Sequence, residues 1–462
     1  MTRFLEKSRS FYASRYYPIL VWLLVFLGHS TQKDLLFGGI MMLSLVFGLW
    51  INHDIKFTIM PLLTTFFIIP IGEYQTTDPG YDRYLEPHTF IPLVSLAALV
   101  AGSIIYFVIK NRKIANPIPI KGVFLSILIL CGALCLNGIF SPNYTVGNLF
   151  FTVFLILAMP IEYMLFAAFL QYDKAATNYF MNCLVGVGLL ICAELIFAYF
   201  TTVAYDAAGN IIKESVVLGW GIWTNIGSML VFLMPACFYF AANFKHGWIG
   251  YGLGLLHYLC ILLSQSRAAL LVGTLSLLLC LTYICITGKN KKHNRVFTAI
   301  LAGCAVLVVV LFSDKLLSLV NNFLEKGFDD NGRYSLWGSA IDAFLRAPVF
   351  GAGFYDTCSY EGWSTFGMPQ MCHNTILQFL GSAGMIGIGA YVYHRFETVR
   401  LAIRRPNPTK IFASICIIGF LLFGMLDVVF FIGYPNMFYT LLLLFMQFSE
   451  RPDDLPQKTY FN

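Results

Sequence analysis

The sequence predicts an all-α polytopic membrane protein, and two observations support this. Of the 462 residues, 58% are hydrophobic and 12% are charged, about half the charged share of a soluble domain, and the mean hydropathy is +0.72. The apolar residues also fall into repeated runs of about 17–25 residues, the length at which a helix crosses a bilayer, and not into the short alternating segments of a β-barrel. We therefore expect one integral membrane domain over 1–462.

The apolar runs predict twelve to fourteen spans, of which the first three are short. No small-residue cleavage site follows the first run, so it is expected to be a retained span rather than a removed signal peptide. The runs lie at 17–31, 34–51, 57–72, 88–109, 121–140, 148–170, 178–203, 219–242, 247–264, 267–287, 296–313, 373–393, 411–430 and 433–448.

The distribution of charge predicts the orientation. With the N-terminus inside, most of the 30 lysines and arginines fall on the inner side, as the positive-inside rule expects. The basic inner segments include 110–121, 288–295 and 394–410, whereas most acidic residues fall outside. Residues 314–372 then form a large extracytoplasmic loop.

That loop is expected to contain two short helices. DKLLSLVNNFLEKGF, which begins at Asp314, has apolar residues at helical spacing and is predicted to lie on the membrane surface. RYSLWGSAIDAFLRAP, which begins at Arg333, is predicted to be a second helix that ends before Pro348. The other outer segments are 73–87, 204–218 and the tight SQSR junction before the tenth span.

The twelve cysteines are scattered, and most lie in apolar runs where a thiol packs as a small core residue. They show no CxxC zinc pattern. Cys358 and Cys372 share the outer loop, so a disulfide between them is one possibility. Four acidic residues of the 73–87 loop could bind a divalent cation, but a solvated acidic loop explains them more simply, and no metal site is expected.

Three residues are expected to converge at the outer face. Arg267 begins the tenth span in SQSRAALLVG, Arg333 lies in the outer loop, and His373 begins the twelfth span in CHNTILQFLGSAGMIG. Two helix N-termini with two guanidinium groups favour phosphate or pyrophosphate binding. A histidine at a helix N-terminus is biased towards the neutral form, which a general base requires.

Each of these residues has a simpler explanation when it is taken alone. Arg267 could be an interfacial anchor with its stem in the apolar zone, Arg333 a solvated loop residue, and His373 a structural histidine. The functional interpretation depends on the three meeting at one face.

These motifs together resemble the O-antigen ligase superfamily, the ligases and polymerases of bacterial surface polysaccharides. The resemblance rests on SRAALL, GRYSLWGSAIDAF, PVFGAGF and HNTILQFLGSAGMIG, within the motif region 262–387, and on the asparagine-containing WTNIGSMLVFLMP. The N-terminal half matches only in hydropathy. The chain differs from many relatives in its extra spans and in the cysteine before His373.

The resemblance implies a GT-C-like, metal-independent inverting glycosyltransferase without a cofactor, in the cytoplasmic (inner) membrane, with its active site facing the periplasm or exterior. The donor would be a glycan on undecaprenyl pyrophosphate, and the acceptor a glycan, a lipid core such as that of lipopolysaccharide, or a protein. Arg267 and Arg333 would hold the pyrophosphate and His373 would activate the acceptor hydroxyl. Membrane lipids are expected partners, and nucleic acid is not.

Three secondary candidates accompany this set. Asp427 lies in an apolar span near the predicted outer end, where an intramembrane carboxylate is a functional candidate; it could orient His373, pair with an arginine, or be structural. Asn225 could line a groove for the lipid carrier, and Asn374 follows the histidine. Glu162 and Glu194 are intramembrane acids for which a proton relay is the weaker interpretation.

The motifs leave ligase and polymerase unseparated, because the two share a donor and differ in acceptor. The alternative from another class is a transporter or flippase for an anionic lipid-linked glycan, which would also need outer arginines. A transporter should show internal repeats and broken midplane helices, which the sequence does not indicate. The motifs of the peptidoglycan polymerases of the shape–elongation–division–sporulation type are likewise not recognised.

Overall fold

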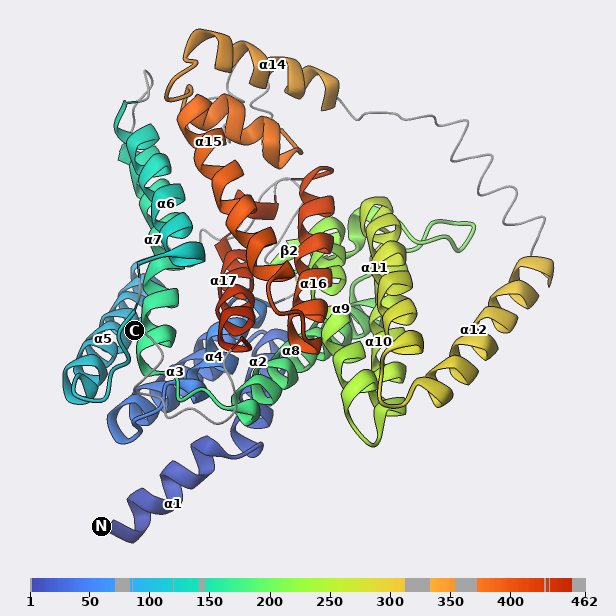
Figure 1. Cartoon of the computed structure of the whole chain (residues 1–462), viewed down its shortest axis with the longest axis horizontal. Helices are drawn as coiled ribbons and strands as arrows, with labels where there is room; N and C mark the ends of the chain where they lie inside the picture. The colour runs from blue at the N-terminus through green and yellow to red at the C-terminus, as the bar shows by residue number, and fades with distance from the viewer. Residues whose placement is uncertain are drawn as a thin grey trace.

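The structure is a bundle of helices with a short two-stranded hairpin, as Figure 1 shows. This computed structural model describes residues 2–70, 84, 86–118, 120–140, 146–311, 333–353, 372–427, 429–431 and 433–450. The predicted all-α polytopic membrane architecture is confirmed.

The first half of the chain contains eight described α-helices, which follow the predicted apolar runs after an N-terminal helix that precedes them. They are α1 (Thr2–Ala13), α2 (Tyr16–Thr31), α3 (Asp34–Ile51), α4 (Ile59–Thr64, flanked by the 3-10 turns η1, Lys56–Thr58, and η2, Thr65–Ile68), α5 (Pro87–Asn111), α6 (Gly122–Phe140), α7 (Val146–Phe169) and α8 (Lys174–Thr201).

The second half begins with a connection that holds a 3-10 turn and the hairpin, and then continues as helices. The elements are η4 (Lys213–Ser215), β1 (Val217–Leu218), β2 (Gly221–Ile222), α9 (Trp223–Asn243), α10 (Gly247–Leu263), α11 (Arg267–Ile286), α12 (Lys291–Leu311), α14 (Arg333–Arg346), α15 (Thr375–Ile403), α16 (Pro408–Gly424), η5 (Val429–Phe431) and α17 (Gly433–Phe448). The helix predicted from Asp314 lies outside the described residues.

Among the described residues, six helices have at least 18 residues and enough hydropathy to cross a membrane, and α1 with α2, bent by 71°, makes up to seven. Five further apolar helices are shorter. Most predicted runs are therefore helical in the described part of the chain. The five shorter helices are long enough to cross a membrane only together with the residues that flank them.

The helices bury different shares of their surface, which shows where the core lies. In α9, 89% of the spanning window is buried against α8, α10, α11 and α16. In α5, whose window is as apolar as that of α8, only 11% is buried. Such an outward-facing apolar helix is suited to lipid, since water would make that exposure unfavourable.

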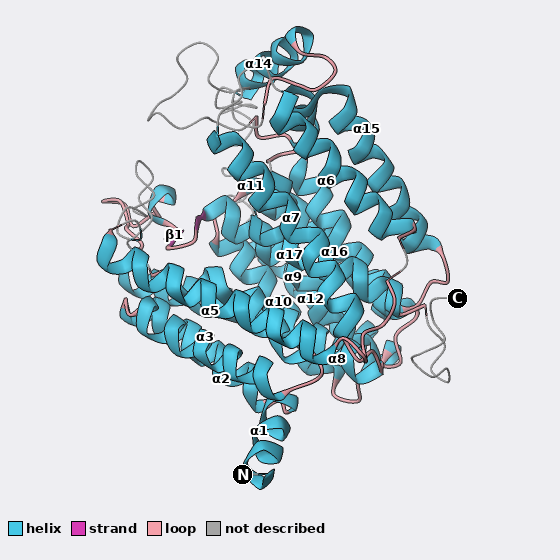
Figure 2. Cartoon of the chain, turned by 90° about the vertical axis from the view of Figure 1, so that its left-hand side faces the viewer, coloured by secondary structure: helices cyan, strands magenta, loops and turns pink. Residues whose placement is uncertain are grey.

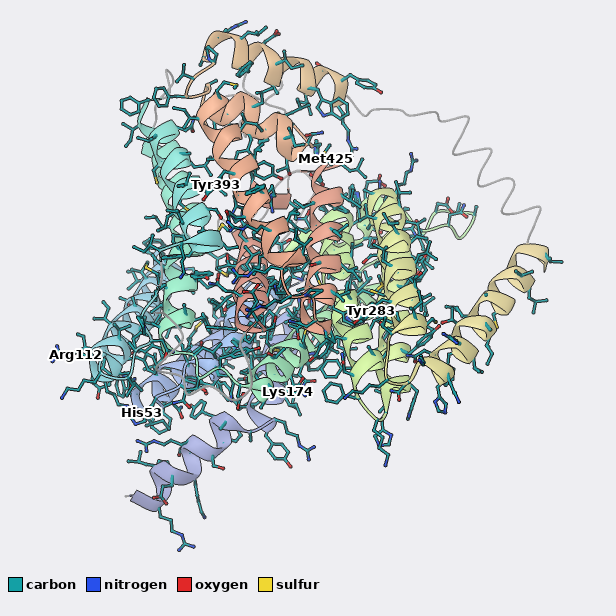
Figure 3. The ribbon with its side chains drawn as sticks, in the orientation of Figure 1. His53, Arg112, Lys174, Tyr283, Tyr393 and Met425 are labelled. Atoms are coloured by element: carbon teal, nitrogen blue, oxygen red, sulfur yellow. The ribbon has the colours of Figure 1, made fainter. Side chains whose placement is uncertain are left out.

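The two ends of the bundle differ. Helix α14 and the first part of α15 lie across one end, as both views show (Figures 1 and 2). Met425 lies towards that end, whereas His53, Arg112 and Lys174 lie towards the opposite one (Figure 3). We call these the α14 end and the basic end.

The span predicted at 373–393 is wrong in its boundaries. The helical residues run from Thr375 to Ile403, and Gly384 interrupts them with a non-helical backbone (φ 59°, ψ −158°). Residues 394–403, expected as part of an inner loop, therefore belong to the helix.

Cysteine labelling can test the orientation in cells. In a background without the twelve native cysteines, Ala208→Cys, exposed between α8 and α9, should react with a membrane-impermeant thiol reagent in intact cells. Lys292→Cys, exposed near the start of α12, should react only after permeabilisation, because basic segments stay inside. Strong labelling of Lys292→Cys in intact cells would overturn the orientation.

Candidate functional site

His373 and Asp427 form the central contact of the candidate site. His373 Nδ1 lies 3.1 Å from Asp427 Oδ1, and the two side chains are 42% and 14% exposed. A carboxylate only accepts hydrogen bonds, so a neutral imidazole in this contact carries its proton on Nδ1. Nε2 then has a lone pair that can accept a proton. Of the three roles considered for Asp427, the structure supports the one in which this carboxylate orients His373.

The segment around His373 is fixed by contacts with the end of α16. Asn374 caps α15 by accepting hydrogen bonds from the backbone N–H groups of Ile376 and Leu377, and its amide donates to Met425 O at 3.2 Å. Thr375 Oγ1 donates to Asp427 O at 3.2 Å. The helix therefore begins at Thr375, not at His373, and Asn374 has a structural role as its cap.

Backbone strain also marks this segment. Among the described non-glycine residues, only Gln32, Gln265, His373 and Arg405 have positive φ. Two of these four lie in the predicted motifs, His373 at 49° and Gln265, two residues before Arg267, at 57°. Such conformations cost about 1–3 kcal/mol and concentrate at functional sites.

Helix α14 links Arg333 to the histidine segment. Arg333 is the first residue of α14, one turn before Trp337 on the same face. Trp337 Nε1 donates to Cys372 O at 3.0 Å, and Cys372 N–H donates to Gln378 Oε1 at 2.8 Å. Cys372 is fully buried with Ala340, so the cysteine before His373 packs between the two helices.

The break in α15 is filled by the turn that follows α14. A continuous helix would bond Met385 N–H to Gly381 O and Ile386 N–H to Ser382 O. Those four groups instead pair with residues 348–353, by hydrogen bonds that connect Met385 N to Pro348 O, Ile386 N to Val349 O, Ala352 N to Gly381 O and Gly353 N to Ser382 O. We call this arrangement the clamp.

The clamp explains why PVFGAG and GSAG occur together in one chain. Both lost helical hydrogen bonds are replaced across the clamp, so the break leaves no orphaned backbone group at these positions. The buried Asn137 of α6 adds to it, because its amide donates to both Phe350 O and Ser382 O. Helix α14, which begins at Arg333, and helix α15, which follows His373, are therefore held together.

Gly384→Ala should therefore disrupt the clamp. Gly384 has φ +59°, and a Cβ there would lie 2.6 Å from Gly351 N, so an alanine adds a clash to a backbone strain of about 1–3 kcal/mol. We expect a lower melting temperature and reduced activity. Gly389→Ala is the matched control, since a Cβ at this position of the same helix meets nothing within 4 Å. Equal melting temperatures for the two variants would contradict the clamp.

Arg267 lies where it was predicted, at the first position of α11. Ser266 caps the helix by accepting a hydrogen bond from Ala269 N–H. The α9 helix packs closely on this turn, because a Cβ at Gly227 would lie 2.5 Å from Ala269 Cβ. Asn225, half-buried and two residues before Gly227, is therefore next to the Arg267 turn.

A third cation, Lys213, belongs to the same region and was missed in the sequence. Its amine lies 4.9 Å from the centre of the Trp223 ring. Burial lowers the pKa of Lys213, and the positive charges of Arg267 and Arg333 lower it further, whereas Glu214 raises it. Arg267 and Arg333 therefore lie within electrostatic reach of one amine, although they begin different helices. The only sequence signal was that Lys213 is the single basic residue of the outer segment 204–218.

The remaining predicted residues are either outside the described part of the chain or have other contacts. Cys358 and most of the acidic 73–87 loop lie outside the described residues, so the possible bridge to Cys372 stays a prediction. Glu194 accepts a hydrogen bond from Trp220 Nε1 at 2.8 Å, which ties the hairpin to α8. Within the described part of the chain, His, Cys, Asp and Glu form no group of three that could hold a metal.

A transporter is expected to have broken helices. The sequence did not indicate one, but α15 has a break at Gly384. Gly384 is twenty residues from Arg404, a rise of about 30 Å in a helix, which is about the thickness of the hydrocarbon core. The 18-residue apolar window of α15 nevertheless includes Gly384, because the residues after it carry Arg395, Glu397 and Arg400. A break inside an apolar helix is also a feature of transporters.

Comparison with known proteins gives two similarities. Residues 252–392 match the family model described as O-antigen ligase, which encloses the predicted motif region. The exopolysaccharide production protein ExoQ of Rhizobium meliloti (strain 1021) is 28% identical over 171 residues, which covers 33% of this chain and 39% of that protein. The chain thus matches well under half of this relative's length. Both findings confirm the resemblance inferred from the motifs.

Proposed function

We propose, from the premise that residues 252–392 are an O-antigen ligase region, that this protein is a membrane glycosyltransferase of surface-polysaccharide assembly. It transfers a glycan from an undecaprenyl-pyrophosphate carrier to an acceptor hydroxyl at the α14 end, which faces the outside of the inner membrane. Two observations support the proposal: the His373–Asp427 contact, and the electrostatic effect of both Arg267 and Arg333 on Lys213.

The histidine acts on the acceptor. With Nδ1 held by Asp427, Nε2 takes the proton of the acceptor hydroxyl while its oxygen attacks the anomeric carbon of the donor sugar. Asp427 stabilises the resulting imidazolium without taking the proton, as carboxylates do in related acid–base arrangements. A single displacement of this kind inverts the anomeric carbon.

The arginines act on the leaving group. As the bond between the anomeric carbon and the phosphate oxygen breaks, its electron pair goes to the pyrophosphate, whose negative charge increases. Arg267 and Arg333 neutralise that charge with forked, charge-assisted hydrogen bonds. Preorganised cations of this kind can take the place of a metal ion in stabilising the leaving group.

The experiment is transfer by the purified full chain in liposomes, with a synthetic polyprenyl-pyrophosphate glycan and a panel of acceptors. We expect loss of the lipid-linked donor and formation of one glycosidic bond per released polyprenyl pyrophosphate. A lipid-linked acceptor identifies a polymerase, and a core lipid or protein acceptor a ligase. Movement of donor between leaflets without any transfer would refute the proposal and favour the transporter.

A further inference from the structure

A pocket opens at the basic end, away from the candidate site. Its volume is about 250 Å³, and it lies between the start of α6, the end of α15 and the end of α17. The charged residues that line it are Lys121, Glu397, Arg400, Arg404 and Glu450.

Positive charge is in excess at this pocket. Glu397 Oε1 is 3.2 Å from Arg400 Nη1, and Glu450 Oε1 is 2.6 Å from Lys410 Nζ. Because the fully buried Lys410 already offsets Glu450, Arg404, whose Nε is 3.9 Å from Glu450 Oε2, is only weakly engaged by that acid. Arg404 and the exposed Lys121 therefore remain to attract an anion.

The position of the pocket matches a membrane boundary. Arg404 follows α15, about 30 Å along the helix from Gly384, a separation close to the thickness of a bilayer's hydrocarbon core. Figure 2 shows α15 running from the α14 end towards the other end of the bundle.

Apolar side chains continue from the pocket along α15. Phe396, Val399 and Ile403 are 61%, 56% and 71% exposed. Phe396 and Ile403 are neighbours of Arg400 on the helix, because they lie four residues before it and three after it. A ligand that contacts this whole face needs an anionic head and long apolar chains.

We propose that this pocket binds the phosphate headgroup of an anionic phospholipid, with its acyl chains along the Phe396–Ile403 face. A free phosphate would engage the same cations but not the apolar face. A zwitterionic lipid would bring a second, positive group into a pocket that already has excess positive charge. Basic pockets between spanning helices recognise anionic headgroups in this way.

The test uses the purified full chain and native mass spectrometry with phosphatidylglycerol, phosphatidylcholine and inorganic phosphate as separate probes. We expect one tightly retained phosphatidylglycerol, with weaker phosphatidylcholine. Lys121→Gln with Arg404→Gln should weaken phosphatidylglycerol binding by about 25-fold, at about five-fold for each charge removed. Thermal unfolding with and without lipid checks that the variant is folded, and Lys121→Gln alone should show the smaller effect.

Arg112→Gln with Lys174→Gln is the matched control, because it removes two exposed charges from the same end outside the pocket (Figure 3). This control should keep wild-type lipid binding. An equal loss in both double variants, or no loss in the pocket variant, would overturn the site. Inorganic phosphate that binds as tightly as phosphatidylglycerol, with the same residue dependence, would overturn the lipid as its occupant.

Discussion

Replacement of His373 by alanine should lower glycan transfer by about 10²–10⁴-fold, the usual contribution of a general base. The acceptor hydroxyl is a poor nucleophile until its proton is removed, whereas the pyrophosphate leaves readily once cations balance its charge. Donor affinity should therefore remain close to wild type, since Arg267 and Arg333 are unchanged. The measurement is the transfer rate and the donor dissociation constant of the same purified preparations.

Two companion variants sharpen this prediction. Asp427→Asn keeps the size of the side chain but removes the charge that stabilises the imidazolium, so it should reduce the rate without weakening donor binding. His88→Ala, a change at a solvent-exposed histidine in the first turn of α5 with a 77% exposed side chain, should leave both unchanged. Near-normal transfer by His373→Ala, or an equal loss of donor affinity and rate, would reject the base assignment.

Replacement of Arg267 or Arg333 by alanine should instead act on the donor. A charge-assisted hydrogen bond contributes about 1.5–3 kcal/mol, so each single variant should bind the pyrophosphate-linked donor about 10- to 100-fold more weakly. Because both arginines lie near Lys213, the double variant should bind it more weakly than either single variant. Isothermal titration with a non-hydrolysable pyrophosphate lipid measures this effect apart from chemistry.

The nature of the guanidinium group gives a second test. Arg267→Lys keeps the charge but loses the planar fork, so transfer should still be impaired. Arg346→Ala, at the far end of the same helix as Arg333, serves as the control for charge loss on α14. Full activity of Arg267→Lys would return Arg267 to the simpler role of an interfacial anchor.

Some features of this protein follow from the sequence because their causes are local. Apolar runs of spanning length must satisfy their backbone as helices in lipid, and the described parts of most predicted runs are helical. The start of α11 follows from Ser266, whose side chain caps the helix, and the end of α14 from the proline that follows it. The grouping of Arg267 with Arg333 could be predicted only after the apolar runs had been given a membrane orientation.

Other features were decided by contacts between segments that lie far apart in the chain. The glycine at 384 is compatible with a continuous helix, and only the 348–353 turn, which supplies replacement hydrogen bonds, makes the break stable. The pairing of His373 with Asp427 depends on α15 packing against the end of α16. Lys213 is fixed by its contact with Trp223, the first residue of α9. Hydropathy sets which segments enter the membrane, but lipid favours no particular side-chain pairing among them. That choice is left to packing and hydrogen bonding between helices, which only the tertiary structure reveals.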